Sequence, residues 1–191
     1  MAEEIFYHVV TERQLLPGQT INFDSQKSGV YQRVIEKEKI VLDIYNHPNK
    51  YIESNLDHHT KVALRELALE EVRKEKFPNY PSRLKSLYVS KSIKEAQMWA
   101  DSFITQGRKV FAIVTVRTDG NSFTGDAYNC FEGTINHNIN LSLAHKYWNN
   151  EINSSQKEPI YETIIDGNIT VIRTIKNYEK IWYKINNYTF K

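Results

Sequence analysis

The stretch FYHVVT (Phe6–Thr11) places a histidine in the middle of a short apolar run of the kind that forms a buried β-strand. Successive side chains of a strand point to opposite faces of its sheet, so Tyr7 and Val9 share one face and His8 lies on the other. A histidine at this place either makes a structural hydrogen bond or faces a ligand cleft. The strand alone favours the structural hydrogen bond, because buried polar groups usually find ordinary partners.

A second informative segment, RLKSLYVSKSIKEAQMWA, occupies residues 83–100. Residues 87–90 predict the end of a strand that contains Tyr88. Ser92 and Glu95 have the spacing of a capping box, which begins a helix by satisfying backbone N–H groups of its first turn. The apolar residues that follow recur at helical spacing and end at a glycine suited to a C-terminal cap: Ile93, Ala96, Trp99, Ala100, Phe103, Ile104 and Gly107. Tyr88 therefore precedes a helix N-terminus, where backbone N–H groups and the helix dipole favour an anionic ligand.

Together these segments resemble the ADP-ribosyltransferase superfamily. The shared features, in chain order, are a strand with a Tyr-His pair, a Pro-Gly turn, a strand with Tyr88 and Ser90, an A-x-x-W-A helix, and an apolar strand at residues 109–116. In particular, the chain looks like the small bacterial enzymes that ADP-ribosylate rifamycin antibiotics and like a bacterial family of uncharacterised proteins with the same plan. The similarity covers residues 5–173 and is looser over residues 24–80.

The resemblance implies an α+β fold in which two bent sheets form a split β-sandwich, with helices at the sides and an NAD cleft between the sheets. It also implies roles for individual residues. His8 would bind the adenosine ribose of NAD, and Tyr88 would stack on the nicotinamide ring by aromatic and cation–π attraction. Thr11 and Ser90 would add hydroxyl contacts to NAD, although small polar residues at strand ends commonly make only local hydrogen bonds.

Two residues compete for the catalytic carboxylate. Cleavage of the nicotinamide bond leaves a cationic ribose, which a nearby carboxylate stabilises. Many members of the superfamily use a Glu at the start of a late strand, which Glu162 matches, whereas the rifamycin-modifying enzymes use an Asp that Asp126 matches. Glu162 is slightly favoured because a strand holds a side chain more rigidly than a loop does. Without such a role, Glu162 would be a solvated residue at a strand edge, and Asp126 would belong to a peripheral turn.

Composition predicts a single domain spanning residues 1–191 and limits its partners. The chain has 191 residues and a net charge of +2, which is too small to argue for nucleic acid. No apolar run is long enough to cross a bilayer, and residues 1–4 lack the form of a signal peptide. Cys130 is the single cysteine and predicts a reducing compartment, hence a cytoplasmic protein. The six histidines show no metal-ligand spacing, so no metal is expected.

Other segments are less informative. Residues 60–76 predict an amphipathic helix and residues 141–150 a short one, whereas residues 29–45 mix strand-like and helical patterns. The aromatic and basic tail, residues 177–191, favours an edge strand over a surface for single-stranded nucleic acid.

The predicted function is therefore NAD-dependent mono-ADP-ribosyl transfer, with NAD as a substrate and a protein, a nucleic acid or a small molecule as acceptor. One alternative is NAD-dependent removal of an RNA 2′-phosphate, which needs several arginines to grip phosphates, and the arginines here are scattered. The other is a non-catalytic relative that acts as a binding module, including one for nucleic acid. Release of nicotinamide from NAD separates the enzymes from the binding module.

Overall fold

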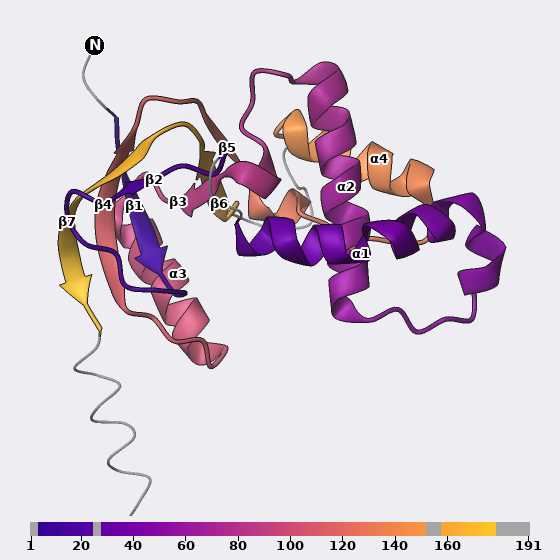
Figure 1. Cartoon of the computed structure of the whole chain (residues 1–191), viewed down its shortest axis with the longest axis horizontal. Helices are drawn as coiled ribbons and strands as arrows, with labels where there is room; N and C mark the ends of the chain where they lie inside the picture. Colours follow the sequence, from indigo (N-terminus) through magenta and orange to yellow (C-terminus); the bar gives the residue numbers. More distant parts are fainter. Residues whose placement is uncertain (1–3, 25–27, 152–157, 179–191) are drawn as a thin grey trace, which may run out of the picture. The chain divides into compact units, whose positions relative to one another are not determined.

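The computed structural model describes residues 4–24, 28–151 and 158–178. The protein is α+β, and its strands fall into two sheets. The chain forms two compact units, each assembled from separate stretches of sequence. Among the described residues, unit 1 takes 4–22, 87–120 and 165–178, and unit 2 takes the rest. Figure 1 follows the chain by colour from one stretch to the next.

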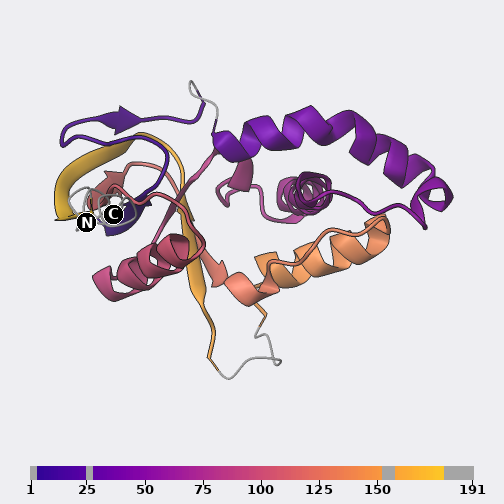
Figure 2. The same ribbon diagram turned by 90° about the horizontal axis from the view of Figure 1, so that it is seen from below.

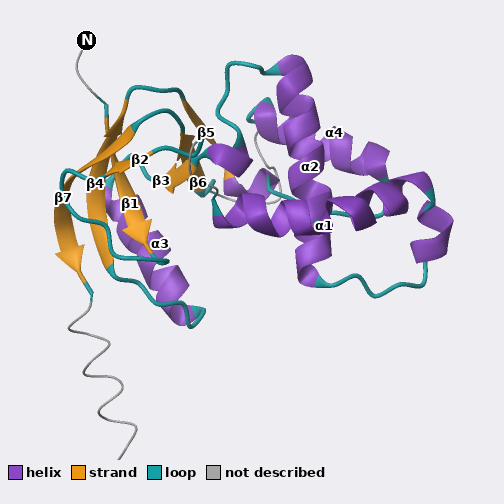
Figure 3. Cartoon of the chain, viewed as in Figure 1, coloured by secondary structure: helices purple, strands orange, loops and turns teal. Residues whose placement is uncertain are grey.

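Unit 1 is an antiparallel sheet with one helix against it, drawn in Figure 3 as orange strands and a purple helix. The strands of the sheet follow the order β1-β4-β7-β2. β4 and β7 pair with two register shifts, between Ile113 and Val114 and between Thr115 and Val116, where the strands depart from regular pairing. The elements of unit 1 are β1 (Ile5–Val10), β2 (Thr20–Ile21), β3 (Leu87–Val89), α3 (Ile93–Thr105), β4 (Ala112–Thr118) and β7 (Ile169–Asn177).

The alternation predicted for the first strand is present in β1. Val9 belongs to an apolar cluster with residues of α3, and Tyr7 packs against the same cluster. Figure 2 shows α3 running alongside the strands of this unit. Since neighbouring side chains of a strand point to opposite faces, His8 lies on the face of β1 away from α3.

The predicted capping box begins α3. The Ser92 hydroxyl accepts a hydrogen bond from the Glu95 backbone N–H, and the Glu95 carboxylate accepts one from the backbone N–H of Ser92. At the other end, Gly107 has a positive φ of 76°, which a glycine adopts without strain. Local sequence therefore sets both ends of this helix.

Unit 2 is mainly helical. α2 lies between α1 and α4, and in Figure 2 it is seen end-on between them. Its elements are α1 (Gly29–Asn46), η1 (Pro48–Tyr51), α2 (His58–Lys76), η2 (Arg83–Lys85), β5 (Ser122–Asp126), η3 (Ala127–Asn129), α4 (His137–Trp148) and β6 (Tyr161–Ile165, of which Ile165 belongs to unit 1). β5 and β6 are neighbours in the second sheet.

The helix α1 covers residues 29–45, where the sequence mixes strand-like and helical patterns. Val34, Val41 and Ile44 are fully buried, but Ile35 and Leu42 are exposed apolar residues of the same helix. These exposed residues widen the apolar pattern beyond one stripe, so the helical period is hidden. The predicted helices at residues 60–76 and 141–150 are present, but they begin earlier, at His58 and His137.

Across the described residues, no helix combines the length and the apolar character that a membrane span requires. The tail that was predicted as an edge strand lies outside the described residues from residue 179 onward.

Candidate functional site

His8 and Tyr88 lie next to each other in unit 1. Ser90 lies two residues after Tyr88 and directly follows β3. Its backbone exchanges two hydrogen bonds with the backbone of Tyr7, at 2.9 and 2.8 Å. This bridge sets the end of β3 beside β1. His8 Nδ1 then lies 2.8 Å from the backbone oxygen of Tyr88. Two residues that are 80 positions apart in sequence are thereby fixed as neighbours.

The protonation of His8 follows from this contact. Burial lowers the pKa of His8 from its ordinary value, although the hydrogen bond to Tyr88 and the charge of Glu12 oppose the change. At neutral pH the ring is therefore uncharged and carries one proton. Because the Tyr88 oxygen can only accept, that proton is on Nδ1, and Nε2 keeps its lone pair. His8 thus offers a hydrogen-bond acceptor, which is the group that a ligand hydroxyl needs.

The two predicted hydroxyl residues differ in their surroundings. Ser90 is buried beside Tyr7 and belongs to the bridge described above. Thr11 follows the end of β1, and its hydroxyl accepts a hydrogen bond from Arg108 at 3.2 Å. The structure therefore brings His8, Tyr88 and Ser90 together, whereas the Thr11 hydroxyl is paired with Arg108, 97 residues further along the chain.

Glu162 belongs to unit 2, near the start of β6, where its side chain is mostly buried and held by two hydrogen-bond donors. One carboxylate oxygen, Oε1, accepts hydrogen bonds from the Tyr147 hydroxyl at 2.7 Å and from Nη1 of Arg83. Arg83 also donates to the Tyr147 hydroxyl at 2.6 Å. The side chain of Glu162 is 14% exposed, compared with 5% for Arg83. The alternative in which Glu162 is only a solvated strand-edge residue does not agree with these contacts.

Arg83 is held in turn by Glu66 of α2. Nε of Arg83 donates to Oε2 of Glu66 at 2.9 Å, and Nη2 donates to Oε1 at 3.3 Å. Arg65 donates twice to the same Oε1, at 3.0 and 2.8 Å. Two carboxylates and two guanidiniums therefore form one charge-balanced group, the Glu162 network, which consists of Arg65, Glu66, Arg83, Tyr147 and Glu162.

The network keeps its innermost carboxylate ionised. Burial of Glu66 raises the pKa of its carboxyl, but the guanidiniums of Arg83 and Arg65 together lower the pKa by more than burial raises it. The net result is a pKa below the ordinary value. Cys130 lies beside this group, with Sγ 3.5 Å from Nη2 of Arg83. Burial raises the pKa of the Cys130 thiol to about 11, so it is a thiol and not a nucleophilic thiolate at neutral pH.

The second oxygen of Glu162 differs from the first. Oε2 makes no hydrogen bond to any of the described residues, and it is not among their fully buried polar atoms without a partner. Glu162 therefore presents a carboxylate with one oxygen anchored by two donors and the other accessible. Such an arrangement suits a group that must face a developing positive charge in a fixed orientation.

Asp126 is not in a peripheral loop, and this expectation is corrected by the structure. It ends strand β5 and is 4% exposed. Its Oδ1 accepts a hydrogen bond from the backbone N–H of Tyr128 at 3.0 Å, and its own backbone N–H donates to Asn150 at 3.2 Å. The Gly- and Asn-rich sequence around Asp126 concealed the strand. The carboxylate of Asp126 is engaged in capping η3.

Sequence reasoning missed the partners of Glu162. Arg83 was only one of the scattered arginines, and Tyr147 was only one residue of the predicted short helix at residues 141–150. A signal was present in α2, where Glu66 stands three residues after Ala63 and three before Leu69, both fully buried. A charged residue in the buried phase of a helix predicts a buried ionic partner.

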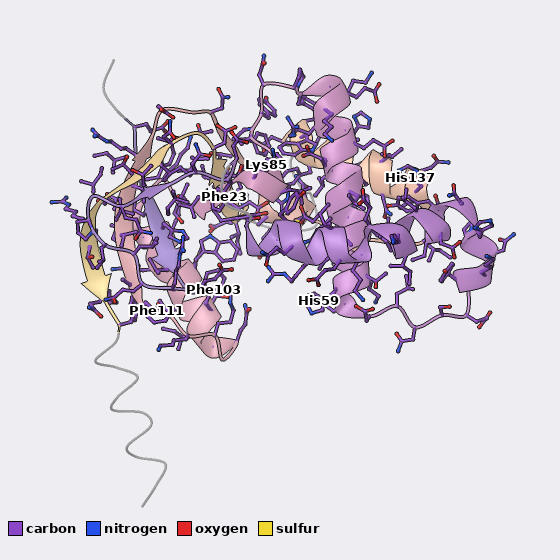
Figure 4. The ribbon with its side chains drawn as sticks, in the orientation of Figure 1. Phe23, His59, Lys85, Phe103, Phe111 and His137 are labelled. Atoms are coloured by element: carbon purple, nitrogen blue, oxygen red, sulfur yellow. The ribbon has the colours of Figure 1, made fainter. Side chains whose placement is uncertain are left out.

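No metal centre is apparent in the part of the chain that the structure describes, where no three His, Cys, Asp or Glu side chains are grouped to hold an ion. His59 and His137, labelled in Figure 4, lie on α2 and α4. His137 stacks on Tyr45 with ring centroids 4.0 Å apart and contacts Glu71 through Nε2 at 2.9 Å. These contacts explain His137 without a ligand.

The fold and these two groups define an α+β protein with a histidine–tyrosine pair in one unit and an anchored carboxylate in the other. Comparison with known families then gives its membership. Residues 6–177 match the model of the family described as "Protein of unknown function (DUF2441)", and the chain belongs to that family. None of the curated proteins compared with the chain matches it.

Proposed function

We propose that this member of the DUF2441 family transfers ADP-ribose from NAD to an acceptor and releases nicotinamide. One observation carries the proposal, namely the contact between His8 Nδ1 and the Tyr88 backbone oxygen at 2.8 Å. It brings together the two residues that the resemblance to ADP-ribosyltransferases assigns to NAD. In the same proposal, the finer architecture is the split β-sandwich of that superfamily.

The reaction breaks the bond between C1′ of the ribose and the nicotinamide nitrogen. The bonding electrons leave with nicotinamide, which becomes neutral, and the ribose becomes an oxocarbenium ion. The acceptor then donates a lone pair to C1′ and loses its proton to solvent. With water as the acceptor the product is free ADP-ribose. NAD is consumed and is neither reduced nor oxidised.

Each residue has a task that its surroundings support. His8 Nε2 accepts a hydrogen bond from a hydroxyl of the adenosine ribose. The Tyr88 ring stacks on nicotinamide, and Glu162 places its accessible oxygen toward the oxocarbenium ion. Asp126 is the weaker candidate for this last task because its carboxylate caps η3.

The first test uses the purified full chain and NAD labelled in the nicotinamide ring. We expect release of labelled nicotinamide that depends on the protein and continues with time. Incubation of a cell lysate with NAD labelled in the adenylate part then shows whether label enters protein, nucleic acid or small molecules. If the folded protein releases no nicotinamide in either setting, the transferase proposal fails and a binding module takes its place.

Variants assign the roles. We expect Glu162→Gln to bind NAD but to turn it over at least about 100-fold more slowly, because the charge that faces the cation is lost. Glu53→Gln, an exposed residue of the same unit, is the matched control and should keep the full rate. Asp126→Asn should keep most of the rate, and the reverse result for Asp126 and Glu162 would assign the carboxylate to Asp126.

The nicotinamide platform has its own test. Tyr88→Ala should weaken NAD binding more than Tyr88→Phe, by about 1–2 kcal/mol, because stacking needs the ring and not the hydroxyl. Calorimetry with NAD measures both variants. Equal affinity in wild type and in folded Tyr88→Ala would contradict the assignment of Tyr88.

A further inference from the structure

We propose that Tyr147 and Arg83 are positioning residues, which fix the carboxylate of Glu162 in the orientation that the reaction needs. This inference rests on the proposed function and extends it to residues that the resemblance does not assign. Neither residue touches NAD in this scheme, and both act through Glu162.

The geometry of the two donors is the first argument. Both reach the same oxygen of Glu162, Oε1, and they also bond to each other, so donors and acceptor form a closed triangle. A carboxylate held by a single donor can rotate about that bond. Two donors that come from different elements, η2 and α4, remove this freedom. The position of the other oxygen, Oε2, is then fixed although neither donor bonds to it.

The rigidity of the donors is the second argument. Tyr147 is fully buried, and its ring packs against Phe123 and Trp148 with centroid distances of 5.4 and 4.9 Å. The guanidinium of Arg83 lies over the same Tyr147 ring, with Cζ 4.9 Å from the centroid. Packing of this kind fixes the ring and with it the position of the hydroxyl oxygen, which lies 2.7 Å from Oε1 of Glu162.

The role of Glu66 is the third argument. It occupies Nε and Nη2 of Arg83, which leaves Nη1 as the nitrogen directed at Tyr147 and Glu162. Because Arg65 neutralises part of the charge of Glu66, Arg83 keeps positive charge for Glu162. A simple stabilising ion pair does not need this second arginine. The chain of contacts therefore runs from a buried acid, through an oriented arginine, to a partly exposed acid.

The test removes one atom. Tyr147→Phe deletes the hydroxyl that bonds to Glu162 and keeps the packed ring. We expect kcat for nicotinamide release to fall by about tenfold, the equivalent of one hydrogen bond, while KM for NAD changes by less than about twofold. The matched control is Tyr45→Phe in the same unit, whose hydroxyl donates to the Leu64 backbone and does not contact Glu162. Tyr45→Phe should leave both constants unchanged.

A double-mutant cycle separates positioning from a structural role. If Tyr147 acts through Glu162, Tyr147→Phe should have little further effect on kcat in a Glu162→Gln background. A merely structural role would slow both backgrounds by the same factor. Equal factors in the two backgrounds, or an unchanged kcat in Tyr147→Phe, would overturn the inference.

A spectroscopic measurement makes the inference independent of turnover. In protein labelled with carbon-13 at the glutamate carboxyls, the signal absent from Glu162→Gln identifies Glu162. Its chemical shift should move in Tyr147→Phe and stay in place in Tyr45→Phe. If wild type releases no nicotinamide while this shift moves, the transferase proposal fails and the positioning of Glu162 stands. If the shift does not move, Tyr147 does not position Glu162.

Discussion

Replacing Arg83 by methionine is the most direct test of the Glu162 network as a source of stability. The substitution keeps much of the side-chain volume and removes the guanidinium. The lost hydrogen bonds include two to Glu66, one to Tyr147, one to Glu162 and a long one to Sγ of Cys130. Of the two acids that lose a partner, Glu66 is only 2% exposed, so water cannot replace the lost hydrogen bonds. Arg83→Met therefore leaves a buried charge with half of its partners.

The magnitude follows from the partners that remain. Removing one member of a buried ion pair costs about 3–5 kcal/mol when the other charge is left uncompensated. Here Glu66 keeps two hydrogen bonds from Arg65, and Glu162 keeps one from Tyr147. We therefore expect the lower end, a loss of about 3 kcal/mol in the free energy of unfolding, or about a 100-fold change in the ratio of folded to unfolded protein.

Urea denaturation followed by circular dichroism measures this loss, with the slope of the transition compared between variants. Lys61→Met is the matched control, because it breaks an ion pair with Glu132 in which both side chains are at least one-third exposed. Exposed pairs contribute about 0–1 kcal/mol. A loss below about 1 kcal/mol for Arg83→Met, equal to that of Lys61→Met, would refute the reasoning that the network is a desolvated unit.

Three further predictions concern single residues. The folded-state pKa of Glu66 is below its ordinary value near 4.5, so its contribution to the free energy of unfolding is present above that pH and is lost as the pH falls through the lower folded value. Urea titrations at neutral pH and at pH values below 4.5 should show this loss of free energy. The loss should be smaller in Glu66→Gln. With a thiol pKa of about 11, Cys130 should react with iodoacetamide at pH 8 at least about tenfold more slowly in the folded protein than in urea, and equal rates would contradict the burial of its sulfur. Ser92→Ala removes the N-cap of α3 and should lower the free energy of unfolding by about 1 kcal/mol; an unchanged transition midpoint in urea would show that the capping box is dispensable.

The elements of unit 1 were largely predictable because their signals are local. The alternation around His8 predicts β1, and the capping box with Gly107 predicts both ends of α3. The strand at 109–116 was predicted three residues too early, since Ala112 begins β4. A run of apolar residues marks burial and not the point at which ladder pairing begins.

The partners of Glu162 could not be predicted in the same way. Arg83, Tyr147 and Glu66 are far from Glu162 in sequence, and their spacing forms no motif. Only the folded chain brings η2, α4, α2 and β6 together. The prediction that Asp126 lies in a turn failed for a different reason. The glycine and asparagine residues near it are typical of turns, but strand pairing overrode that local preference.

The strand order of unit 1 has a consequence for the synthesis of the protein. β7 pairs with β4 through one edge and with β2 through the other, yet it is the last of the described strands to leave the ribosome. Until residues 169–177 emerge, Thr20 and Ile21 have no strand to pair with, and the backbone of β4 has one open edge. Such edges are templates for pairing with other chains. Unit 1 must therefore complete its sheet after most of the chain has been made, and a nascent chain stalled before β7 would be prone to aggregate.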